Sequence, residues 1–116
     1  MIGRLSGRHD FSRLRAEGVR SGQGPIRLVS RLDGAQNAQI AFAIPRTVGN
    51  AVARNRIRRR IRAILEDLHR SDSSVPMGGD YLIRITAPLT DWPHARLRHA
   101  MATLLSPEQL PRETAE

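Results

Sequence analysis

Cysteine is absent from the 116-residue chain, which excludes disulfides and thiolate metal sites and leaves the redox compartment open. No apolar run reaches the roughly 18 residues of a membrane-spanning helix, and residues 1–6 carry no signal-peptide core. A cytoplasmic protein is therefore expected. Aromatic residues make up only 3% of the chain, so a sheet surface that stacks several bases is poorly supplied.

Lysine is absent too, and all 19 basic residues are arginine. Strong codon bias accounts most simply for the missing lysine, but it does not explain the formal net charge of +8. Such an excess points to a polyanion, with nucleic acid first and an anionic membrane surface second. Arginine suits phosphate because its planar guanidinium binds it in a bidentate manner and also stacks on bases.

Catalytic chemistry finds little support among the side chains of this sequence. Glu66 and Asp67 are adjacent, so on a helix their side chains diverge and cannot form a two-metal carboxylate site. The histidines lack metal-ligand spacing and have no triad-like neighbours; they are His9, His69, His94 and His99. We therefore expect no catalytic residue and no metal site in the protein itself.

The hydrophobic pattern predicts the order α-β-β-α-β-α. The expected elements are a helix over 10–17, strands over 26–32 and 39–45, a helix over 50–69, a strand over 80–86, and a last helix opened by Asp91. Residues 22–25 and 33–34 are expected turns. This order predicts an α+β two-layer sandwich, a small mixed sheet with helices packed on it, as one domain over residues 1–106. Residues 107–116 are polar and expected to be disordered.

The long helix has an apolar stripe and a dense basic surface. Asn50 is a natural N-cap, and the stripe consists of Ile57, Ile61, Ile64, Leu65 and Leu68. Six of the nine residues from 54 to 62 are arginine, and no acidic residue stands between Asp33 and Glu66. On a helical wheel the following arginines spread across the side away from the stripe: Arg56, Arg59 and Arg62. Arg58 and Arg60 flank the stripe, and Arg54 falls near it in the first turn.

This arrangement destabilises an isolated helix. Like charges four residues apart cost a few tenths of a kcal/mol per pair, and positive charge in the first turns opposes the helix dipole. A solvated surface usually mixes both signs of charge, and this one does not. The pattern therefore indicates a helix that RNA or DNA phosphates neutralise.

The segment 44–62 is similar to the signature of the bacterial ribonuclease P protein subunit. The sequences Gly49-Asn50-Ala51-Val52 and Arg54-Asn55-Arg56 match that signature outright. The resemblance extends along most of the chain through Leu5, Phe11, Gly18 and residues 80–83.

The resemblance implies a three-stranded sheet with a left-handed β-α-β crossover, the ribosomal protein S5 domain 2-like fold. It also implies an accessory subunit of the ribozyme that removes the 5′ leader from precursor tRNA. The expected partners are the catalytic RNA and the leader, with no membrane and no obligate protein partner. No cofactor is expected on the protein alone, and Mg²⁺ is expected in the particle through the RNA.

Charge and resemblance together give nine candidate RNA-binding residues: Arg46, Asn50, Arg54, Asn55, Arg56, Arg58, Arg59, Arg60 and Arg62. The resemblance also implies a cleft for the single-stranded leader between the first helix and the sheet, lined by Phe11 and Phe42. A plain core role for Phe42 is the alternative.

Three departures from the family pattern bear on this cleft. Pro45-Arg46-Thr47 stands where Ser-Lys-Lys is usual. Leu14-Arg15 stands where an aromatic commonly follows Phe11, and Val29 stands where another aromatic is frequent. All three reduce the expected basic or aromatic lining of the leader cleft.

Two other classes of protein share some of these features. A ribosomal or other structural RNA-binding protein would have the charge and lack the catalysis, but it does not explain the Gly-Asn-Ala-Val and Arg-Asn-Arg context. A helix that lies on a membrane surface would have to insert its apolar stripe into lipid. A domain of this size needs those isoleucines and leucines for its core.

Overall fold

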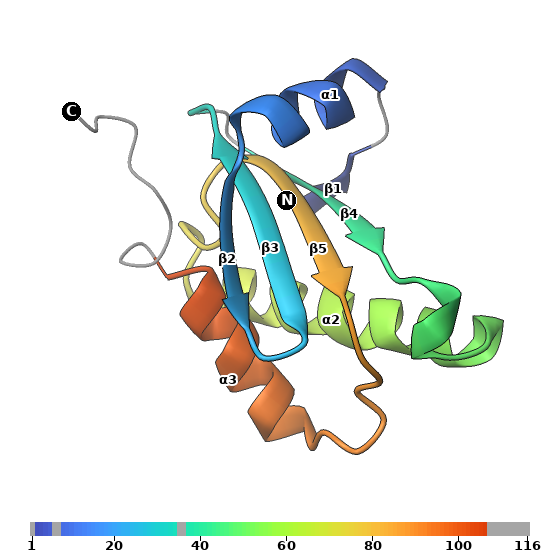
Figure 1. The fold of residues 1–116 in the computed structure, drawn as a ribbon. Coiled ribbons are helices and arrows are strands. Elements are labelled where there is room, and N and C mark those ends of the chain that lie inside the picture. Colours follow the sequence, from blue (N-terminus) through green and yellow to red (C-terminus); the bar gives the residue numbers. More distant parts are fainter. Residues whose placement is uncertain (1, 6–7, 35–36, 107–116) are drawn as a thin grey trace.

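The structure is a computed structural model that describes residues 2–5, 8–34 and 37–106, so the predicted tail lies outside the described residues. Its elements follow one another along the chain as coloured in Figure 1. They are β1 (Ile2–Arg4), α1 (Arg8–Glu17), β2 (Val19–Gln23), β3 (Ile26–Leu32), β4 (Ala38–Ala43), the 3-10 helix η1 (Arg46–Val48), α2 (Ala51–Ser71), β5 (Gly79–Ile85) and α3 (His94–Leu104).

The five strands form one mixed sheet in the order β1-β4-β5-β3-β2. β3 is antiparallel to β2 and β5, whereas β4 is parallel to β1 and β5. The mixed sheet is confirmed, but the expectation of three strands is wrong because β1 and β2 were not predicted. Both are edge strands: β1 has three residues, and β2 lacks the apolar alternation of a half-buried strand.

The helices occupy both faces of this sheet. α2 and α3 lie together on one face, and α1 crosses the other (Figure 1). The connection from β4 through α2 to the neighbouring parallel strand β5 is left-handed, as the family resemblance implied. General packing rules favour the right-handed form strongly, so they could not have predicted this feature.

The main core lies between the sheet and the two helices α2 and α3. All five stripe residues of α2 are buried, which confirms the stripe predicted from the sequence. They pack against alternate sheet residues such as Ile40, Tyr81 and Ile83, and against Leu97 and Met101 of α3. Burying this stripe fixes which side of α2 remains for other contacts.

A smaller apolar cluster lies under α1 and includes Leu14, Val29 and Ala41. The end of α1 approaches β3 closely at Gly18. A Cβ there would lie 2.3 Å from the Leu14 carbonyl oxygen and 2.6 Å from Cγ1 of Val29. The predicted helix end at residue 17 is confirmed, and the close approach explains why a glycine follows it. An ion pair of 2.8 Å between Glu17 Oε1 and Arg31 Nε also ties α1 to β3.

Several predicted boundaries differ from the structure by one or two residues: α1 begins at residue 8, β4 ends at residue 43 and α2 ends at residue 71. Two further differences change the interpretation of a turn. The last helix begins at His94 rather than at Asp91, and Pro93 occupies the N-cap position without a side-chain cap. Residues 89–92 instead close a turn, in which the Trp92 amide donates to the Leu89 carbonyl. β2 also continues to Gln23, so the turn before β3 is only the pair 24–25, with Gly24 at φ 58°.

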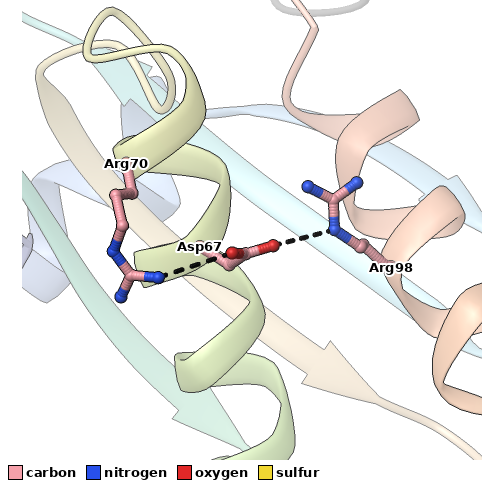
Figure 2. A network of polar contacts seen from close by, with 3 residues as sticks. All are labelled: Asp67, Arg70 and Arg98. Atoms are coloured by element: carbon pink, nitrogen blue, oxygen red, sulfur yellow. Dashed lines mark hydrogen bonds and ion pairs between the residues drawn. The ribbon is translucent and has the colours of Figure 1, made fainter.

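α2 and α3 are joined at the surface by the carboxylate of Asp67, as Figure 2 shows. Its Oδ2 accepts from Nε of Arg98 at 3.0 Å, and its Oδ1 lies 3.5 Å from Nη1 of Arg70. These groups are partly exposed, so each pair contributes at most about 1 kcal/mol. Among the described residues, no helix has the length and apolar character needed to cross a membrane.

Candidate nucleic-acid interface

Two side chains form hydrogen bonds to the backbone at the start of α2. The Oδ1 atom of Asn50 accepts from the Ala53 amide at 2.8 Å, which confirms the predicted N-cap. Nε of Arg54 donates to the Gly49 carbonyl at 3.1 Å. Both side chains therefore stabilise the turn that leads into the helix. Arg46, in η1 just before this turn, is exposed.

The basic residues of α2 separate onto two flanks on either side of the buried stripe. One flank carries Asn55, Arg58, Arg59 and Arg62, which line one pocket. The other flank carries Arg56 and Arg60, which line a second pocket toward α3. The wheel had placed Arg62 on the side away from the stripe, but the structure places it half-buried on the same flank as Arg58.

The first of these, here called the α1-side pocket, has a volume of about 510 Å³. It lies where α2, β4 and the N-terminal segment meet, at the edge of the sheet beyond the short strand β1. Its lining is partly apolar and partly basic. The residues are Arg4, Leu5, Phe11, Ile40, Ala41, Phe42, Asn55, Arg58, Arg59 and Arg62.

Two contacts fix arginines at the rim of the α1-side pocket. Nη1 of Arg58 donates to Oδ1 of Asn55 at 2.7 Å, one turn earlier on the same flank. The guanidinium carbon of Arg62 lies 5.8 Å from the centroid of the Phe42 ring, a distance suited to a cation–π interaction. Ordering these side chains before a ligand arrives lowers the conformational entropy lost on binding.

The two predicted cleft aromatics both line the α1-side pocket, but from opposite faces of the sheet. Phe11 belongs to the small cluster under α1, whereas Phe42 packs against the main core on the α2 side. A cleft between the first helix and the sheet therefore contains Phe11 but not the ring of Phe42. Phe42 is partly buried: it packs against the main core and also lines the pocket at the sheet edge.

A second depression, here called the sheet pocket, continues from Phe11 across the sheet face that α1 leaves uncovered. Its volume is about 370 Å³. Its lining residues are Phe11, Leu14, Arg15, Arg20, Val29, Ala43, Leu82 and Arg84. Because Phe11 lines both pockets, they share a wall.

Sequence reasoning missed three arginines of the sheet pocket: Arg15, Arg20 and Arg84. Arg84 could have been identified, because the alternation in the predicted strand over 80–86 places it on the side away from the main core. Arg20 could not, because β2 was not predicted. Arg20 pairs with Val29, and Val29 pairs with Leu82, so these three residues share one face of the sheet. Arg84, two residues after Leu82 on β5, is on the same face.

Arg60 differs from the other predicted RNA-binding residues. Its Nη1 donates to the Leu89 carbonyl at 3.2 Å, and its Nη2 donates to the Trp92 carbonyl at 2.7 Å. These bonds join α2 to the loop before α3, across 32 residues of sequence. Arg60 therefore has a structural role that charge alone did not predict. Arg56 and Arg59 are exposed.

Comparison with known proteins places the chain in a family. The family model described as Ribonuclease P matches residues 3–108. The ribonuclease P protein component of Kocuria rhizophila is 31% identical over 97 residues, which cover 80% of this chain and 83% of that protein.

Solved structures of ribonuclease P proteins have the same fold. The protein from Staphylococcus aureus has a TM-score of 0.74 at 18% identity, over 92% of this chain and 95% of its own. The protein from Thermotoga maritima has a TM-score of 0.73 at 23% identity, over 88% of this chain and 94% of its own. With the family match over nearly its whole length, this chain belongs to the ribonuclease P protein family.

Proposed function

We propose that this chain is the cytoplasmic protein subunit of a ribonuclease P particle and assists the removal of the 5′ leader from precursor tRNA. The observation that carries the proposal, in a member of this family, is the basic α2 surface, which borders the α1-side pocket. The sheet pocket adjoins the α1-side pocket at Phe11, which lines both. In this reading, the α2 arginines bind phosphates of the catalytic RNA. The leader then lies in the α1-side and sheet pockets.

The charges support phosphate binding over other chemistry. Among the side chains that the structure describes, none of those lining either pocket is acidic. Four arginines line the α1-side pocket: Arg4, Arg58, Arg59 and Arg62. Three arginines line the sheet pocket: Arg15, Arg20 and Arg84. Arginine guanidinium groups bind phosphates through charge-assisted hydrogen bonds. Neutralising several phosphates releases counterions, so binding falls steeply as the salt concentration rises.

The cleavage chemistry is assigned to the RNA partner. Among the described residues, no three His, Cys, Asp or Glu side chains gather in a group that could hold a metal ion. We propose that the RNA binds the Mg²⁺ ions and supplies the reacting groups. The protein positions the leader and neutralises phosphate charge.

A structural RNA-binding protein without a role in cleavage is the competing function. Capture of the tagged chain from a cell extract, followed by sequencing of the bound RNA, separates the two. The proposal predicts enrichment of one RNA of a few hundred nucleotides together with precursor tRNAs. Enrichment of ribosomal RNA in their place would refute the proposal.

A further inference from the structure

α2 has a second basic pocket on the flank opposite the α1-side pocket. This α3-side pocket has a volume of about 330 Å³ and is closed by the loop between β5 and α3. Its lining residues are Ala53, Arg56, Ile57, Arg60, Thr90 and Trp92. The leader path proposed above does not reach it, because the body of α2 lies between the two pockets.

The wall of the α3-side pocket is held in place by Arg60. One guanidinium donates to two backbone carbonyls of the loop, those of Leu89 and Trp92. The Trp92 amide also donates to the Leu89 carbonyl, which closes the turn. A loop fixed in this way needs little further ordering when a ligand binds to it.

Arg96 extends the basic surface onto α3. Its guanidinium carbon lies 3.8 Å from the centroid of the Trp92 ring, and its side chain is exposed. Stacking on an aromatic ring holds the guanidinium plane, and the N–H groups at the edge of that plane remain able to bind phosphate. Trp92 thus contacts Arg96 on α3 and lines the same pocket as Arg56 on α2.

Acidic side chains do little to neutralise this surface. Asp91 is the one acidic residue in the loop, and it is exposed and does not line the pocket. Asp67, farther along α2, is occupied by Arg98 and Arg70 (Figure 2). The three arginines around Trp92 therefore carry excess positive charge.

We propose that the α3-side pocket and Arg96 bind a backbone segment of the catalytic RNA, on the flank of α2 opposite the leader in the α1-side pocket. This inference rests on the proposed function. A helix with its side chains is about 10–12 Å across, so phosphates on its two flanks are at least that far apart. α2 then lies between two RNA segments, and both flanks of its arginine cluster are neutralised.

The first test is the variant Arg96→Gln, matched by Arg13→Gln on the exposed surface of α1. Affinity of the full chain for the catalytic RNA is measured over a range of salt concentrations. Arg96→Gln should bind roughly tenfold more weakly, as expected for a lost hydrogen bond to a charged group. The slope of log K against log salt should fall in magnitude by about one. Arg13→Gln should match the wild type in both respects.

The second test maps the RNA next to α3. Because the chain has no cysteine, Ala95→Cys or Ser12→Cys gives a single attachment point for a tethered iron chelate that generates hydroxyl radicals. Both positions are exposed. In the particle with bound precursor tRNA, the probe at position 95 should cut the catalytic RNA, whereas the probe at position 12, next to Phe11, should cut the leader.

Three results would overturn the inference while leaving the proposed function intact. They are equal affinities of Arg96→Gln and Arg13→Gln, absence of cleavage from position 95, and cleavage of the leader from that position. The last result would make the α3-side pocket part of the leader path. Failure of the wild-type chain to bind the catalytic RNA would instead overturn the proposed function and the inference together.

Discussion

The guanidinium carbon of Arg62 lies 5.8 Å from the centroid of the Phe42 ring, so a cation of α2 covers one of the two aromatic side chains at the α1-side pocket. Phe42 is also anchored against the main core. Phe11, in contrast, lines both the α1-side pocket and the sheet pocket. The two aromatic residues therefore differ in how much of each ring a nucleotide could use.

This difference predicts unequal effects on leader binding. Stacking of a base on an aromatic ring contributes about 1–3 kcal/mol, so Phe11→Leu should weaken binding of a long-leader precursor by roughly tenfold. Phe42→Leu should weaken it by less than about threefold, because Arg62 already occupies its ring. Binding of a precursor with a short leader serves as the control in reconstituted particles. Equal losses in the two variants would contradict the assignment.

The N-cap of α2 allows the structural and RNA-binding roles of Asn50 to be separated. Asn50→Ala should lower the free energy of unfolding by about 0.5–2 kcal/mol because the Ala53 amide loses its acceptor. Asn50→Asp keeps an acceptor at this position and should retain the stability, but its negative charge should weaken RNA binding. Urea denaturation and RNA titration check the two effects. Full RNA affinity in Asn50→Asp would remove Asn50 from the interface.

Arg60 and Arg59 are adjacent residues with the same charge and different surroundings. Arg60→Gln should lower the free energy of unfolding by about 1–3 kcal/mol, because the carbonyls of Leu89 and Trp92 lose a charged donor. Arg59→Gln, at an exposed position, should change it by less than about 0.5 kcal/mol. Thermal and urea unfolding of the two variants give the comparison. Similar stabilities of the two variants would show that the Arg60 hydrogen bonds do not contribute to the free energy of unfolding.

The ion pair between Glu17 and Arg31 predicts a dependence of stability on acid. The hydrogen bond and the charge of Arg31 lower the pKa of Glu17 below its ordinary value of 4.5. A lowered carboxyl pKa stabilises the folded state above the unfolded pKa, and this contribution is lost as the pH falls through the folded value.

The wild type should therefore be more stable than Glu17→Gln near neutral pH, and the difference should shrink below about pH 4.5. High salt should reduce the difference as well, because the pair is on the surface. Urea midpoints measured between pH 3 and pH 7 test this. A difference that stays constant across that range would show that ionisation of Glu17 has no part in it.

Much of the fold was predictable because strong patterns determine it. The stripe from Ile57 to Leu68 and the alternation in β3, β4 and β5 each follow from burying one face of an element. β1 was missed because three residues are too few to show a pattern, and β2 was missed because it is an edge strand with little burial. The left-handed connection came from the family resemblance alone.

The sequence predicted which types of residue form the site, but it did not predict which residues they contact. Charge density singled out α2, yet Arg60 had the same signal as Arg59 and proved to join two elements through backbone carbonyls. Such partners lie about thirty residues away in sequence, and no local pattern specifies them. Trp92 gave no periodic signal either, and its meeting with Arg96 depends on the turn before α3.

The central claim is that the basic surface of α2 binds a ribozyme that removes the 5′ leader. Leader cleavage by the reconstituted particle at low Mg²⁺ tests this claim most directly. The wild-type chain should raise cleavage well above that of the catalytic RNA alone. Arg56→Ala combined with Arg59→Ala should keep the fold, since both side chains are exposed, and lose most of this stimulation. The control pair Arg13→Ala and Arg70→Ala removes the same charge elsewhere and should retain it. Stimulation by the Arg56 and Arg59 variant equal to that of the wild type, or no stimulation by the wild type, would contradict the claim.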